Sequence, residues 1–87
     1  MSGHDALRER LLGLLEKASV QGELPPVTPQ THLLRAGVLD SLGVVDLAAA
    51  IEGAWNIRLP RGAVNPANFS TLQSIENMIA EHGGPKP

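Results

Sequence analysis

The chain has 87 residues, enough for one small domain, which we take as residues 1–87 with a core over about 5–82 and short tails. Its 7 basic and 9 acidic side chains give a formal net charge of −2, which argues against nucleic-acid binding because Lys and Arg supply most of the affinity for phosphate. The absence of cysteine excludes disulfide bonds, thiolate metal sites and a cysteine nucleophile, and no apolar run approaches the ~20 residues of a membrane span.

The first segment has the spacing of an amphipathic helix. Asp5 is its expected N-cap and Gly22 its expected stop, and Gly13 should cost about 0.5–1 kcal/mol relative to Ala unless close packing requires it. The apolar positions of one face are Leu7, Leu11, Leu14, Leu15 and Ala18. The charged side chains left for solvent are Arg8, Glu9, Glu16 and Lys17.

A long loop over residues 19–40 follows. Pro25, Pro26 and Pro29 exclude a regular helix through its middle. A connection of this length is more often functional than accidental. Leu33-Leu34 can form a single helical turn begun at Thr31, and its leucines should hold the second half of the loop on the core.

The second long helix should run from about residue 41 to residue 55 and carries two apolar stripes. The stripe expected to pack on the other helices is Val44, Leu47, Ala48, Ile51 and Trp55. A second row lies on a different face and consists of Leu42, Val45 and Ala49. A three-helix protein has little left to cover this row, which is therefore either ordinary surface apolarity or a docking surface.

The last third of the chain contains two further helix signals. Asn65-Pro66 predicts an N-cap with proline at the first helical position of a short helix. In the final helix Ser70 and Gln73 form a capping box, and Gly83-Gly84 followed by Pro85 marks the end. Its apolar face comprises Leu72, Ile75, Met78 and Ile79. No convincing strand is present, so we expect an all-α protein, a small four-helix bundle of three main helices and a short third one.

Ser41 stands at the start of the second helix, where Ser and Asp are preferred caps. A catalytic role has little support, because there is no Gly-x-Ser-x-Gly elbow and His4, His32 and His82 are not spaced as a base would be. A helix N-terminus does favour a phosphoester, since its free N–H groups and dipole attract negative charge. Another enzyme could therefore modify this serine.

The stretch AGVLDSLGVVDL, residues 36–47, resembles the attachment motif of the acyl carrier protein family, in which Asp-Ser-Leu opens the second helix. The similarity extends to the leucine-faced first helix, the proline-containing loop, AAAIEGAWNIRLP at 48–60 and NPANFSTLQSIENMI at 65–79. The resemblance implies a carrier and not an enzyme. A phosphopantetheinyl transferase would attach 4'-phosphopantetheine from coenzyme A to Ser41. A ligase or acyltransferase would load an acyl or aminoacyl thioester on its thiol for downstream biosynthetic enzymes.

Further roles are implied by the same resemblance. Asp40 would help to position a divalent metal during the transfer, with no stable metal site, and capping is a compatible role for it. The partner-facing positions would be Leu42, Val45, Asp46, Ala49 and Glu52. Val64 and the short helix after it would border the arm or its cargo.

The second helix carries few acids, so electrostatic steering should be weak and apolar docking relatively important. This departs from carriers of fatty acid synthesis. The chain instead resembles D-alanyl carrier proteins and free-standing carriers of polyketide, nonribosomal or amino-acid-loading pathways. Without an apparent signal peptide we expect a cytoplasmic monomer.

Two alternatives stay open. One is a non-catalytic helical interaction module in which Ser41 only caps its helix. The other is a small DNA-binding domain, for which Arg58 and Arg61 make a poor basic face.

Overall fold

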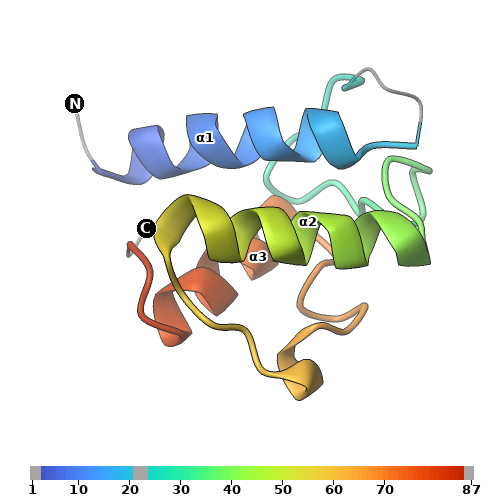
Figure 1. The fold of residues 1–87 in the computed structure, drawn as a ribbon. Helices are drawn as coiled ribbons and strands as arrows, with labels where there is room; N and C mark the ends of the chain where they lie inside the picture. The colour runs from blue at the N-terminus through green and yellow to red at the C-terminus, as the bar shows by residue number, and fades with distance from the viewer. Residues whose placement is uncertain (1–2, 21–23, 86–87) are drawn as a thin grey trace.

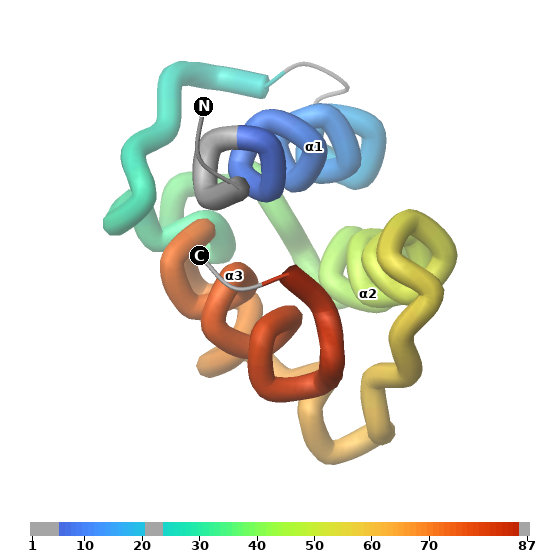
Figure 2. The backbone as a smooth tube through the Cα atoms, turned by 90° about the vertical axis from the view of Figure 1, so that its left-hand side faces the viewer, coloured from blue at the N-terminus to red at the C-terminus, as the bar shows by residue number. Residues whose placement is uncertain are grey.

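The computed structural model describes residues 3–20 and 24–85, with side chains from residue 6 onward. Its elements are α1 (Gly3–Ala18), α2 (Ser41–Trp55), the 3-10 helix η1 (Arg61–Ala63) and α3 (Leu72–Glu81). Helices α1 and α2 lie lengthwise side by side (Figure 1), and a view along them shows α3 completing a three-sided bundle (Figure 2). The described residues contain no strand, which confirms the all-α class with three α-helices and one short 3-10 helix. None of their helices is long and apolar enough to cross a membrane.

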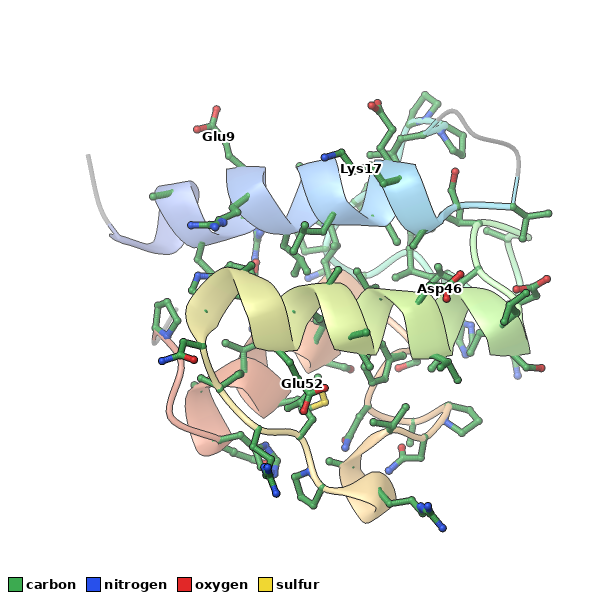
Figure 3. The ribbon with its side chains drawn as sticks, in the orientation of Figure 1. Glu9, Lys17, Asp46 and Glu52 are labelled. Atoms are coloured by element: carbon green, nitrogen blue, oxygen red, sulfur yellow. The ribbon has the colours of Figure 1, made fainter. Side chains whose placement is uncertain are left out.

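The core is formed by the predicted stripes of all three helices, with loop residues closing it. Helix α1 contributes three fully buried leucines, α2 its expected stripe, and α3 four apolar side chains. The loops add Leu33, Val38, Leu39, Leu59 and Phe69, and η1 adds Ala63. Trp55 is half-buried, and the Arg10 guanidinium lies 5.6 Å from its ring centroid. On the outer side of α1, Glu9, Glu16 and Lys17 are exposed as predicted, with Glu9 extending away from the bundle (Figure 3).

Helix α1 begins earlier than the sequence predicts. It starts at Gly3, so Asp5 lies inside the helix and is not its N-cap. Nothing between Gly3 and Asp5 breaks a helix, and the helical backbone continues through these residues. The predicted stop at Gly22 lies outside the described residues, and the helix ends at Ala18. No atom lies within 4 Å of a Cβ built on Gly13, so no packing contact requires a glycine at this position.

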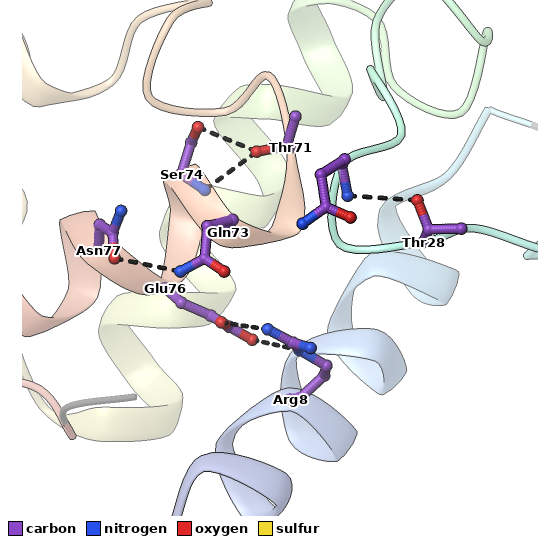
Figure 4. Close-up of polar contacts among 8 residues, drawn as sticks. Arg8, Thr28, Thr71, Gln73, Ser74, Glu76 and Asn77 are labelled. Carbon is purple, nitrogen blue, oxygen red and sulfur yellow. Dashed lines mark hydrogen bonds and ion pairs between the residues drawn. The ribbon is translucent and has the colours of Figure 1, made fainter.

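An ion pair with a fully buried carboxylate joins α1 to α3 (Figure 4). Arg8 Nε donates to Glu76 Oε2 and Nη2 donates to Oε1, each at 2.7 Å. The Glu76 side chain is 0% exposed and that of Arg8 is 23% exposed. The prediction that Arg8 faces solvent is therefore wrong, because a carboxylate on the inner side of α3 draws its guanidinium across the helix interface.

The second half of the loop before α2 forms a hydrogen-bonded turn at residues 33–37 in place of a helix. The Ala36 amide donates to the His32 carbonyl at 2.8 Å, so the turn begins one residue after Thr31. Gly37, at φ +77, ends it in a conformation that side chains disfavour. The Leu33 amide also donates to the Ser70 carbonyl at 2.7 Å, which ties this turn to the segment preceding α3.

The short helix lies upstream of the position predicted for it. Pro60 precedes η1, whereas Asn65-Pro66 opens a single turn in which Asn65 Oδ1 accepts from the Asn68 amide at 2.8 Å. The Phe69 amide donates to the Asn65 carbonyl at 3.3 Å, and the turn does not propagate into a helix. The capping signal is therefore real, but it caps one turn only.

Helix α3 is capped one residue later than predicted. Thr71 Oγ1 accepts from the Ser74 amide at 3.1 Å, while the Gln73 amide donates across the bundle to the Pro29 carbonyl at 3.3 Å. The Ser70–Gln73 box is thus wrong, because the amide it needs has a tertiary partner.

The predicted glycine end of α3 is confirmed. Gly83 has φ +95, and the Gly84 amide donates to the Ile79 carbonyl at 2.8 Å, as in a Schellman motif.

Candidate functional site

The start of α2 presents a free hydroxyl. Asp40 is extended at φ −119 and ψ −174, and its Oδ1 accepts from the Gly43 amide at 2.7 Å, so Asp40 is the N-cap. Ser41 is the first residue inside the helix and is exposed. Its Oγ has no hydrogen-bond partner among the described residues. The alternative that Ser41 serves as the helix cap is therefore wrong, since its neighbour performs that role.

Close packing fixes the position of this corner. A Cβ built on Gly43 would lie 3.0 Å from the Ala18 carbonyl oxygen, so the first turn of α2 packs directly on the end of α1. The Val20 amide donates to the Val38 carbonyl at 3.0 Å, which ties the chain after α1 to the chain before α2. Together these contacts hold Ser41 at a defined place on the surface.

The backbone around Ser41 suits an anion. The first N–H groups of a helix have no partner within it, and the helix dipole adds partial positive charge at this end. The first turn of α2 holds no acidic side chain beyond the cap. A phosphoester on this hydroxyl would therefore lie in a favourable electrostatic environment.

An apolar pocket of about 290 Å³ opens beside the hydroxyl. Its lining consists of Leu34, Ser41, Val44, Val45, Val64, Asn65 and Pro66. The Asn65 amide is already engaged, because Nδ2 donates to the Gly62 carbonyl and Oδ1 accepts from the Asn68 amide, both at 2.8 Å. Ser41 is thus the one polar side chain of this lining without a hydrogen-bond partner among the described residues.

The predicted second row of α2 is uncovered. Leu42 is 68% exposed and Val45 is 57% exposed, and Ala49 and Asp46 are exposed as well. Asp46 lies in the N-terminal half of α2, whereas Glu52 lies toward the other end of the helix (Figure 3). Val64 is half-buried and lines the pocket together with Val45.

Glu52 differs from the other acid of α2. It is half-buried, and its Oε2 accepts from the Leu59 amide at 2.8 Å. Its carboxylate is therefore engaged inside the chain, unlike that of Asp46.

Sequence reasoning missed two members of the pocket lining, Leu34 and Val44, which it assigned only to the core, whereas Asn65 and Pro66 open the segment that the family resemblance places at the border of the arm. The Asn-Pro pair signalled a turn, but nothing in the spacing indicated that this turn would lie opposite the start of α2. The two histidines whose side chains the structure describes make local contacts, His32 Nδ1 accepting from the Arg35 amide at 3.3 Å and His82 Nδ1 lying 2.8 Å from the Met78 carbonyl. No cluster of metal-ligating side chains occurs in the part of the chain that the structure describes.

Comparison with known proteins identifies the family. Residues 5–80 match the family described as phosphopantetheine attachment site. Aminoacyl carrier protein 1 of Bradyrhizobium diazoefficiens is 30% identical over 74 residues, which cover 84% of this chain and 81% of the relative. The probable acyl carrier protein PigG of a Serratia strain is 25% identical, covering 84% of each chain. D-alanyl carrier protein of Streptococcus suis is 37% identical over 56% of this chain and 62% of its own length.

No solved structure gives a significant match. The family match covers nearly the whole bundle, including the corner at the start of α2. A free hydroxyl on a helix N-terminus, with an apolar pocket beside it, is also chemically suited to a phosphate-linked arm. The chain belongs to the phosphopantetheine attachment site family and is a carrier protein.

Proposed function

We propose that this carrier bears its 4'-phosphopantetheine arm on the Oγ of Ser41 and presents an aminoacyl thioester to partner enzymes. The observation that supports this assignment is the exposed, unpartnered hydroxyl at the first residue of α2. Attachment turns that hydroxyl into a phosphodiester, whose charge the helix N-terminus stabilises. The arm supplies the thiol that the chain itself lacks.

The pocket beside Ser41 supports the same assignment. Its aliphatic walls, among them Val45 and Val64, can shelter the apolar carbons nearest to the phosphate. Apart from Ser41, the polar side chain of the lining is Asn65, whose amide nitrogen and oxygen both make local hydrogen bonds. We assign Val64 to the border of the arm on this basis.

Asp40 has a second role in this proposal. Its Oδ1 is occupied by the Gly43 amide, whereas its other carboxylate oxygen has no partner among the described residues. That oxygen can bind a divalent metal during transfer while the cap stays intact, since carboxylate oxygen is a preferred ligand of Mg²⁺.

The exposed row of Leu42, Val45 and Ala49 is proposed as the docking surface for the transferase and the loading enzyme. Two of its side chains are more than half exposed, and an uncovered apolar row of this kind is typical of a binding site. Asp46 lies beside it as the exposed acid of α2.

The proposed cargo is an amino acid. Two relatives that align over more than four-fifths of this chain, from Bradyrhizobium diazoefficiens, are named aminoacyl carrier proteins. The Streptococcus relatives are named D-alanyl carrier proteins. An acyl group is the second candidate cargo, because another relative is named probable acyl carrier protein PigG.

Mass spectrometry tests the attachment. After incubation with coenzyme A and a broad-specificity transferase, the wild-type chain should gain the mass of one phosphopantetheinyl group, and Ser41→Ala should gain none. Ser70→Ala is the matched control and should be modified normally, because its hydroxyl bonds only locally, to the Ala67 carbonyl and near Ser74. Modification of Ser41→Ala would refute the assignment.

Stability separates this proposal from the interaction-module alternative. Because Asp40 is the cap, Ser41→Ala should change the free energy of unfolding by less than about 0.5 kcal/mol. A capping serine would instead cost about 1 kcal/mol, which urea titration can resolve.

A further inference from the structure

Glu52 is the acid of α2 whose surroundings fit a role other than partner recognition. Its side chain extends from α2 toward the segment that follows the helix (Figure 3). There Oε2 accepts from the Leu59 amide at 2.8 Å, across seven residues of sequence. Leu59 itself is buried, so this hydrogen bond lies at the edge of the core.

The backbone of the same residue holds the same segment. The Glu52 carbonyl accepts from the amide of Asn56, the C-cap of α2 in the left-handed conformation at φ 53. It also accepts from the Ile57 amide at 3.2 Å. In the described structure, every hydrogen bond from residues 56–64 to α2 therefore ends on Glu52. Two of these bonds use its carbonyl, which any residue provides, and only the third requires its side chain.

The segment held in this way leads directly to the Ser41 pocket. After Leu59 the chain passes through η1 to Val64, which lines the pocket together with Ser41 and Val45. The hydrogen bonds within 60–65 are local ones, such as the Ala63 amide to the Pro60 carbonyl at 2.9 Å. The placement of Val64 relative to α2 thus depends on packing and on the attachment at Leu59.

We propose that Glu52 is a positioning residue for the Ser41 site. Its carboxylate acts as a hydrogen-bond acceptor inside the chain, holding the 56–64 segment so that Val64 forms the pocket wall, and is not a charge displayed to partner enzymes. This inference rests on the proposed function in taking the pocket to lie beside the arm. It also replaces the role that the family resemblance implied for Glu52.

Two substitutions distinguish the role of the Glu52 side chain as a hydrogen-bond acceptor from the role of its negative charge. Glu52→Gln keeps a side-chain oxygen that can accept from the Leu59 amide but removes the charge, whereas Glu52→Ala removes both. Glu9→Ala is the matched control, because it deletes an exposed acid on the outer side of α1. Each variant is prepared as the full chain, and circular dichroism verifies that it is folded.

Three readouts are measured on all three variants: exchange of the Leu59 amide, the Val64 methyl resonances and the rate of Ser41 modification. Glu52→Ala should raise the hydrogen-exchange rate of the Leu59 amide about tenfold or more and should shift the Val64 methyl resonances. Glu52→Gln should stay within about threefold of the wild type, since a neutral bond retains much of the protection. The rate of Ser41 modification by coenzyme A and transferase should fall in Glu52→Ala, recover in Glu52→Gln and be unchanged in Glu9→Ala.

Unchanged Leu59 exchange in Glu52→Ala would overturn the inference. Equal loss of modification rate in Glu52→Gln and Glu52→Ala would also overturn it, because charge would then be the active property. The extent of Ser41 modification at completion distinguishes the proposed role of Glu52 from the proposed attachment of the arm at Ser41. Full modification of the wild type alongside either of these outcomes rejects only the role of Glu52, whereas an unmodified wild type rejects Ser41 as the attachment site whatever the exchange data show.

Discussion

The buried ion pair between α1 and α3 allows a quantitative test of how this bundle is held together. Arg8→Met keeps most of the apolar stem of the side chain but removes the guanidinium, leaving the fully buried Glu76 carboxylate without its bidentate partner. Breaking a buried pair in this way costs about 3–5 kcal/mol. Because the Arg8 side chain is 23% exposed, water can partly replace it, and we expect about 2–4 kcal/mol.

Urea titration followed by circular dichroism measures this loss. With a denaturant slope of about 1 kcal/mol/M for a chain of this size, the midpoint should fall by roughly 2 M or more. That loss is a large fraction of the ~5–15 kcal/mol typical of a domain.

The double variant Arg8→Met/Glu76→Leu provides the control. Residue 76 packs beside the apolar side chains of α3, so a leucine there should restore stability to within about 1 kcal/mol of the wild type, as replacement of buried pairs by apolar residues often does. A change below about 0.5 kcal/mol in Arg8→Met alone would refute the view that this pair is desolvated. A double variant no more stable than Arg8→Met would refute the view that the unpaired carboxylate is the source of the loss.

Two further predictions concern α1 and α2. Gly13→Ala should raise the free energy of unfolding by about 0.5–1 kcal/mol, because the added methyl group meets open space within a helix; a loss of stability in urea titration would contradict this. Val45→Asp should leave the arm attached at Ser41 but slow thioester formation by the loading enzyme, since it places a charge on the exposed apolar row. Equal loading rates in a single-turnover assay would remove that row from the docking surface.

The sequence predicts the elements whose signals are local. Helix α2 has the predicted bounds, and its inward stripe is buried, because heptad-like spacing and a preceding Asp-Ser pair act within a few residues. The glycine end of α3 is equally local. Helix caps are harder to predict from sequence, because the amide that a cap needs can donate to a distant group instead. The Gln73 amide does so when it donates to the Pro29 carbonyl.

The features that escaped prediction depend on distant contacts. Arg8 and Glu76 are 68 residues apart, and only the packing of α1 on α3 brings them together. One signal was nevertheless present, because Glu76 shares its helix face with Leu72 and Ile79, where an acid requires a partner. The pocket beside Ser41 combines three separate segments of the chain, and no spacing within any one of them indicates their meeting.

Asp40 caps α2, whereas Ser41 provides the proposed attachment oxygen. This separation of roles matters each time a carrier is modified or loaded. A serine that capped its own helix would have its capping hydrogen bond weakened each time its oxygen was esterified, because a phosphoester oxygen is a poorer acceptor than a hydroxyl oxygen. The fold would then lose stability whenever the prosthetic group was installed. Here the Asp40 carboxylate accepts the capping hydrogen bond, so modification of Ser41 Oγ does not affect the helix cap. Apo, holo and loaded forms can therefore keep the same cap at the start of α2.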